Sequence, residues 1–145
     1  MDIEALLCDA ATVRENLLHI LGGGLGQLWR DAYPAPLGVD LALLLTLHPS
    51  EATDEHELRI LIQDTDGKEI ARIEATFAIG PQVAQIPAGQ MVRAPIAIPL
   101  REVPIPAPGL YSFELLVDKQ HRRSLPFQAM PAGDRPPFQA LLPPQ

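Results

Sequence analysis

The sequence contains a single cysteine, Cys8, in 145 residues. One thiol cannot close a disulfide within the chain, and so sparse a use of cysteine is typical of a reducing compartment. Long apolar runs are also absent, because the longest, residues 41–45, is far below the roughly 20 residues of a membrane-spanning helix. The first residues, MDIEAL, carry two acids and no basic region, unlike a secretory signal. We therefore expect a cytoplasmic protein that does not bind membranes.

Basic residues are scarce. Eleven Lys and Arg residues stand against 18 Asp and Glu residues, which gives a net charge of −7. The one basic run is residues 121–123, and an acidic surface repels the phosphate backbone of nucleic acids. We therefore expect no nucleic-acid partner.

Recognisable catalytic and cofactor motifs are missing as well. Nucleophilic catalysis needs a nucleophile next to a base, and no spacing links Cys8 to any of the four histidines. The run LGGGLG, residues 21–26, does not match a phosphate-binding loop. The dinucleotide-binding pattern would need a glycine at the position of Gln27 or Trp29, and the P-loop would need a lysine, which is not present nearby. We expect no catalytic residue and no cofactor. We interpret LGGGLG as a bend and predict a positive φ angle for at least one of its four glycines.

Two acidic segments are candidate cation sites. His48 and His56 flank the loop PSEATDE, and clusters of His, Asp and Glu bind divalent metals. A solvated loop between two strands is the commoner structure for such a segment, so we assign no metal site. Residues 64–67 resemble part of a calcium loop, but the twelfth position is Ala75 and not the required Glu. We interpret residues 64–68 as a hairpin turn.

Apolar and polar residues alternate with a period of two along most of the chain, and 16 prolines and ten glycines interrupt the alternation. This pattern predicts an all-β antiparallel β-sandwich of seven to eight strands. Residues 9–16 are more polar, and we expect a turn there or a short helix capped by Thr12. Pro95 and Pro99 cannot donate to a ladder, which predicts that their strand lies at a sheet edge. The expected strands are residues 3–8, 17–21, 38–48, 57–63, 69–79, 92–100, 110–117 and 122–129.

The last fifteen residues, 131–145, differ in composition from the rest. Five of them are prolines, which predicts an extended C-terminal arm attached to a domain of residues 1–130. The arm carries three apolar side chains that are suited to docking in a groove or along a sheet edge. These are Phe138, Leu141 and Leu142.

Trp29, Arg30 and Tyr33 form the one aromatic and cationic cluster of the sequence. These residue types are frequent at the centre of protein interfaces, so we name them, with the three apolar residues of the arm, as candidate partner-binding residues. A tryptophan in such a position also commonly caps an open end of the core.

The segments DAATVRENLLHILGGGLGQLWR, PAPLGVDLALLLTLHP and PGLYSFELLVDKQHRRSLPFQA resemble a family of small uncharacterised bacterial β-sandwich proteins. The resemblance covers residues 1–130 and implies a bacterial cytosolic protein, with no activity or cofactor attached to it. The closing hairpin also resembles the last strands of Ig-like and C2-like sandwiches, a pattern that does not fix function.

These features favour a non-enzymatic protein-interaction or assembly module. We expect it to bind a protein partner, or to associate with itself, through its C-terminal arm. The alternative is a β-sandwich that binds a small ligand or a metal through the loop between His48 and His56.

Overall fold

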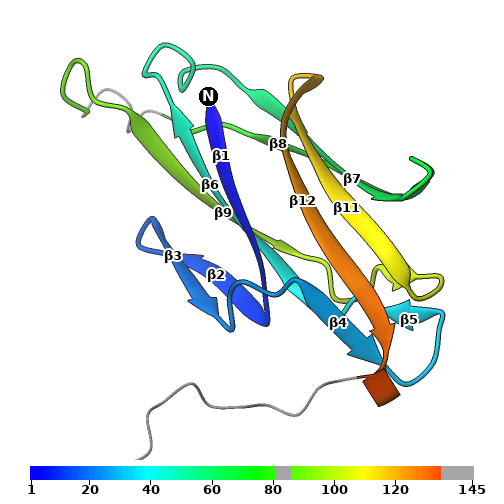
Figure 1. Cartoon of the computed structure of the whole chain (residues 1–145). Helices are drawn as coiled ribbons and strands as arrows, with labels where there is room; N and C mark the ends of the chain where they lie inside the picture. Colours follow the sequence, from blue (N-terminus) through cyan, green and yellow to red (C-terminus); the bar gives the residue numbers. More distant parts are fainter. Residues whose placement is uncertain (81–85, 135–145) are drawn as a thin grey trace, which may run out of the picture.

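Two β-sheets lie face to face in the computed structural model, which describes residues 1–80 and 86–134 (Figure 1). The smaller sheet has three strands in the order β1-β6-β9, and the larger has five in the order β4-β12-β11-β7-β8. The fold is an all-β sandwich, as the alternation predicts. The strands of these sheets are β1 (Asp2–Cys8), β6 (Asp40–Leu47), β9 (Val92–Pro99), β4 (Gln27–Arg30), β12 (Gln120–Pro131), β11 (Gly109–Val117), β7 (His56–Asp64) and β8 (Glu69–Phe77).

The core lies between the two sheets and consists of alternate side chains of the long strands. Leu41, Leu43, Leu45 and Leu47 of β6 are completely buried, because the period of a strand places all four on the face toward the larger sheet. Burial of each such side chain stabilises the fold by about 1.5–3 kcal/mol. Phe113 of β11 lies at the centre of the opposite sheet, with its ring 4.9 Å from that of Phe127.

Both predicted hairpins are present. Residues 64–68 join β7 to β8, with Gly67 at a φ of 79° and the Asp64 carboxylate accepting the backbone N–H of Asp66 and of Lys68 at 3.0 and 2.9 Å. Asp118 and Lys119, with φ angles of 51° and 68°, form the two-residue turn between β11 and β12. Positive φ at both central residues matches the right-handed twist of the strands that such a turn connects.

A third hairpin replaces the turn or short helix that we expected at residues 9–16, and that prediction is wrong. Strand β2 (Ala10–Arg14) pairs antiparallel with β3 (Leu17–Leu21). The turn between them is Glu15-Asn16, with φ angles of 53° and 58°, and Glu is an unusual residue for this conformation. The hairpin contacts β6 and β9, and Figure 1 shows it beside the lower part of the smaller sheet.

The described residues contain twelve strand segments, where the sequence predicts seven or eight. Eight of them match the strands that the sequence predicts, namely the seven long strands β1, β6, β7, β8, β9, β11 and β12 together with β3 (Leu17–Leu21). The others are β2, β4 and the two-residue strands β5 (Ala35–Pro36) and β10 (Pro104–Ile105), of which β5 and β10 pair with each other. Strand β4 pairs in parallel with the end of β12, an exception to the antiparallel arrangement that we expected.

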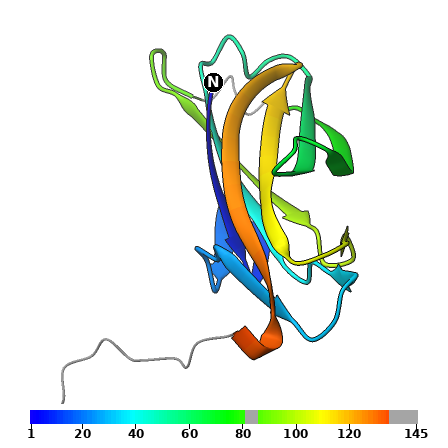
Figure 2. The same cartoon turned by 45° about the vertical axis from the view of Figure 1, so that its right-hand side comes forward.

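The start of the predicted arm is part of the folded domain. Strand β12 runs the length of the sandwich and includes Pro131, and the short 3₁₀ helix η2 (Ala132–Asp134) follows it (Figure 2). The rest of the predicted arm lies outside the described residues, including Phe138, Leu141 and Leu142.

The LGGGLG segment forms the bend that we predicted. Gly22 and Gly24 have φ angles of 62° and 91°. The backbone N–H of Gly24 donates to the carbonyl of Leu7 at 2.9 Å, and a Cβ atom on Gly22 would lie 2.9 Å from that of Asp9. The glycines therefore let the end of the β2–β3 hairpin return closely to the end of β1.

Candidate functional site

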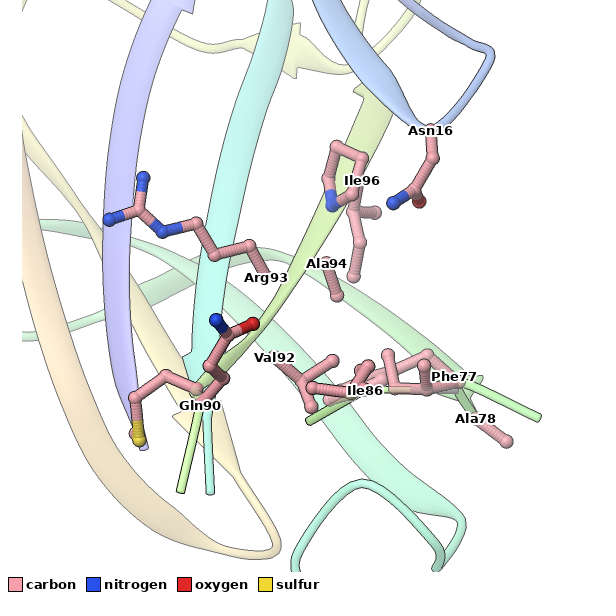
Figure 3. A pocket seen from close by; sticks show the side chains of 12 residues that line it. Asn16, Phe77, Ala78, Ile86, Gln90, Val92, Arg93, Ala94 and Ile96 are labelled. Atoms are coloured by element: carbon pink, nitrogen blue, oxygen red, sulfur yellow. The ribbon is translucent and has the colours of Figure 1, made fainter. Parts of the chain in front are cut away.

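A groove of about 730 Å³ opens at the side of the sandwich, between the end of β8 and strand β9 (Figure 3). We call it the edge groove. Figure 3 shows Phe77, Ile86 and Val92 gathered on one side of it, with Asn16 of the β2–β3 turn across from them. It is lined by Asn16, Phe77, Ala78, Ile79, Ile86, Gln90, Met91, Val92, Arg93, Ala94, Pro95 and Ile96.

Most residues that line the edge groove are apolar, although polar and apolar atoms contribute about equally to its exposed surface. Arg93 is the one charged side chain among the described lining residues, and in Figure 3 it extends away from the apolar group around Val92. Met91 is 49% exposed although it is a large apolar residue. Apolar side chains with a few amide groups between them can bind apolar side chains and hydrogen-bond to a peptide backbone. General acid–base catalysis needs side chains that gain or lose a proton near neutral pH.

Strand β8 forms one border of the edge groove and is the outer strand of the larger sheet. It pairs with β7 on one side, and on its other side no strand of the described ranges 1–80 and 86–134 pairs with it. It contains no proline, so every residue retains its N–H group. Backbone donors and acceptors along such an edge can pair with another strand.

Opposite charges lie on the outward face of β8. The Arg72 guanidinium binds the carboxylates of Glu69 and Glu74, with N–O distances of 2.7 and 3.4 Å. Glu74 also binds Arg59 of β7 at 3.2 Å. Arg72 and Glu74 are each about half exposed, at 46% and 49%. These ion pairs lie where solvent screens them, so they contribute little to stability and can be exchanged for others.

Strand β9 forms the other border of the edge groove and is the outer strand of the smaller sheet, as Pro95 and Pro99 predict. Its ladder with β6 runs from Val92 to Pro99 without a register shift. A proline fits an unbroken ladder only where its nitrogen faces away from the neighbouring strand. The outer edge of β9 therefore lacks two donors.

A buried histidine lies behind the wall of the edge groove. His56 of β7 is 8% exposed, and its ring stacks on the Phe77 ring with centroids 5.3 Å apart. Its Nδ1 lies 2.7 Å from Oδ2 of Asp118, and its Nε2 lies 2.5 Å from the carbonyl oxygen of Glu51. Both partners are acceptors, so both ring nitrogens must donate, which requires the protonated imidazolium. We call this group the His56 clamp.

The electrostatics of the His56 clamp agree with a charged ring. Burial by itself lowers the pKa of His56, but the hydrogen bonds to Asp118 and to the Glu51 carbonyl, together with the Asp118 charge, outweigh it and raise the pKa. The hydrogen bond from His56, followed by that from the backbone N–H of Glu57, lowers the pKa of Asp118. The clamp thus ties the 48–56 loop, β7 and the β11–β12 turn together.

The residues of the metal-site alternative do not converge. His48 is exposed and its Nδ1 lies 2.7 Å from the Ser50 hydroxyl oxygen within its own loop, whereas both nitrogens of His56 are used in the clamp. Among the described residues, no group of three or more His, Cys, Asp and Glu side chains is placed to hold a metal ion.

Trp29, Arg30 and Tyr33 lie at the opposite edge of the larger sheet from β8, on β4 and the segment after it. Arg30 donates to the carbonyls of Trp29, Pro36 and Leu37 at 2.8, 3.2 and 2.5 Å. The Tyr33 hydroxyl donates to the carbonyl of Met130 at 2.8 Å, and burial raises its pKa. The Tyr33 bond fastens the segment after β4 to the end of β12, and the Arg30 bonds hold residues 29–37 together. All three side chains remain partly exposed.

A cluster that sequence reasoning missed lies on the outward face of β11 and β12. His121 Nε2 is 2.6 Å from the Glu114 carboxylate and 3.0 Å from the Ser124 hydroxyl. Burial would raise the pKa of Glu114, but hydrogen bonds from Ser124, His121 and Ser112 lower it. The Ser124 hydroxyl donates to Glu114 and not to the histidine, unlike a nucleophile activated by a base. The predicted hairpin of residues 110–117 and 122–129 could have indicated this cluster, because its pairing places Glu114 opposite Ser124.

Fold and site together define an all-β sandwich protein with an open side between two sheet edges. The chain belongs to a family of unknown function, DUF6941, which matches residues 4–130. This match confirms the resemblance to an uncharacterised family, and it includes the edge groove and both of its bordering strands. None of the curated proteins matches the chain. Within the described residues, no helix is long and apolar enough to cross a membrane.

Proposed function

We propose that the chain is a non-enzymatic protein-interaction or assembly module of the bacterial cytoplasm, with an Ig-like type of sandwich. The observation that carries this proposal is the β8 edge, unpaired within the described residues, beside the edge groove with its apolar side chains. An extended segment that adds to a sheet edge gains main-chain hydrogen bonds, and its alternate side chains enter neighbouring apolar pockets. Both requirements are met within one side of the molecule.

The C-terminal arm is the proposed docking segment, either on its own domain or on a partner. Phe138, Leu141 and Leu142 are apolar, which suits a groove whose walls are Phe77, Ile86, Val92 and their neighbours. Residues 135–145 follow η2 directly and would span at most about 40 Å if extended. That length is comparable to the dimensions of a domain of this size.

The test compares three full chains and one shortened chain. We expect that ending the chain at Asp134, or replacing Phe138, Leu141 and Leu142 with Ser, lowers the melting temperature or changes the mass measured by light scattering. The control variant carries Gln139→Ser and Ala140→Ser in the same segment and should behave as the unchanged chain. If melting temperature and mass are the same for all four proteins, the proposed docking of the arm is wrong.

A further inference from the structure

We infer that the β8 edge pairs with the β8 edge of a second copy of this chain, antiparallel about Ile73, with Arg72 of each copy facing Glu74 of the other. This inference rests on the proposed assembly function and names its partner. It is carried by the register and the charges of β8, and it does not depend on the C-terminal arm.

The first step is the geometry of the strand. Strand β8 has nine residues, Glu69–Phe77, so its centre is Ile73. In an antiparallel pair related by a two-fold axis through this centre, the two copies of Ile73 lie opposite each other. Ala71 then lies opposite Ala75, and this regular part of the strand excludes Ile70, where the ladder with β7 shifts register. The inward side chains Ala71, Ile73 and Phe77 pack against the core in each copy, and pairing would make their apolar face continuous.

The second step is the charge pattern. In the register centred on Ile73, Arg72 lies opposite Glu74 twice, once on each side of the axis, and directly opposed ions of opposite charge stabilise a strand pair. A register centred on Arg72 or on Glu74 would instead place like charges opposite each other. Charges at an edge commonly prevent pairing with unrelated strands. The pattern of β8 therefore favours its own copy at the strand edge, which leaves the edge groove, and not the edge itself, to the C-terminal arm.

The third step is the availability of the side chains. Arg72 and Glu74 are about half exposed, and solvent screens the ion pairs that they form with Glu69, with Arg59 and with each other, so they can exchange one of these contacts for one across the axis. The competing edge on the same side of the molecule is β9, where Pro95 and Pro99 remove donors. Within the part of the chain that the structure describes, the long outer strands without proline are β8 and β1, and β1 carries the acids Asp2 and Glu4 but no basic residue to oppose them in a second copy.

The test is a charge exchange in the full chain, followed by light scattering and native mass spectrometry over a range of concentrations. We expect the unchanged chain to dimerise. Arg72→Glu should place Glu opposite Glu, and Glu74→Arg should place Arg opposite Arg, so each variant alone should raise the dimer dissociation constant about tenfold or more. An equimolar mixture of the two variants restores both opposite-charge pairs and should form a mixed dimer with the affinity of the unchanged chain.

The control is Arg122→Glu, the same change of charge on the exposed part of β12, which should leave the dimer intact. A monomeric unchanged chain, a dimer that resists both exchanges, or a mixture that stays monomeric would each overturn the inference. The chain that ends at Asp134 separates this inference from the proposed function. If its mass or melting temperature changes while the charge variants have no effect, docking of the arm stands and pairing through β8 fails.

Discussion

The two strands that border the edge groove, β8 and β9, are both outer strands, but the chemistry of their outer edges differs. Strand β9 has two prolines that face outward, and its Val92 and Ala94 are buried in the core at 3% and 6% exposure. Strand β8 has no proline and no fully buried side chain, and it carries charges of both signs. The comparison shows that one side of a sandwich can have one edge from which prolines remove donors and another that keeps its donors and carries charges of both signs.

The difference extends to how each strand is held. Strand β9 is anchored along its length by apolar side chains in the core, whereas the end of β8 is held by the stack of Phe77 on the ring of His56. The ring of His56 is in turn fixed by Asp118 and by the carbonyl of Glu51. The β8 edge thus depends on a polar group at one end of the sandwich, which provides ways to disturb it selectively.

The largest effect is expected from His56→Ala. The change removes two hydrogen bonds of a charged ring and the support of Phe77, so we expect it to lower the free energy of unfolding by about 2 kcal/mol. His48→Ala is the matched control, because His48 is exposed and binds only within its own loop. We expect a change below about 0.5 kcal/mol for the control. Urea denaturation measures both, and equal losses would contradict the anchoring role of the clamp.

Hydrogen exchange compares the two edges without mutation. We expect the amides of β8 that pair with β7 to exchange at least about tenfold faster than those of β9 that pair with β6, because few buried contacts hold β8 in place. His56→Ala should accelerate exchange in β8 and leave β9 nearly unchanged. Equal protection of both strands in the unchanged chain would mean that the core holds the two edges equally well.

The sequence predicts that β9 is an outer strand but does not predict this for β8, and the reason is physical. Proline acts on its own residue, so Pro95 and Pro99 identify β9 as an outer strand from local chemistry alone. That β8 is also an outer strand follows from the order of the sheet, which depends on pairing between β11 and β7, far apart in the chain. The His56 clamp is equally non-local, since His56 and Asp118 are 62 residues apart.

The missed β2–β3 hairpin has a different cause. Strand β3 matches the predicted strand of residues 17–21, but β2 is mostly exposed and its burial follows no alternation, so the pairing of the two strands was missed. The Glu15-Asn16 turn also lacks the glycine that commonly identifies a two-residue hairpin turn. The long strands were predictable because burial on one face imposes alternation. Gly67 also identifies the β7–β8 turn, whereas the Asp118-Lys119 turn has neither glycine nor proline and was predictable from the apolar strands on both sides of it.

The dependence of stability on pH tests the His56 clamp, which anchors β8, through the protonation of its side chains. The pKa of His56 is raised in the folded state, so its contribution is fully present below the unfolded value of about 6.5 and is lost as the pH rises through the folded value. The pKa of Asp118 is lowered, so its contribution is present above about 3.9 and is lost as the pH falls through the folded value. We expect the melting temperature to decline above about pH 6.5, and we expect His56→Ala to remove this decline. A variant that declines as the unchanged chain does would assign the effect to other groups.

The smallest change in stability, and the most direct test of the comparison, is expected from Pro95→Val with Pro99→Val. These substitutions restore two outward N–H groups to β9, and loss of the rigid rings should change the free energy of unfolding by less than about 1 kcal/mol. If the prolines protect this edge, the variant should form species larger than those of the unchanged chain, and their mass should rise with concentration in light scattering. Ala97→Val is the matched control, because it adds a β-branched side chain between the two prolines without adding a donor. An unchanged mass for the double variant would show that the β2–β3 hairpin, which contacts β9, protects this edge. The two edges would then differ because a neighbouring hairpin covers one of them, and not because of the prolines.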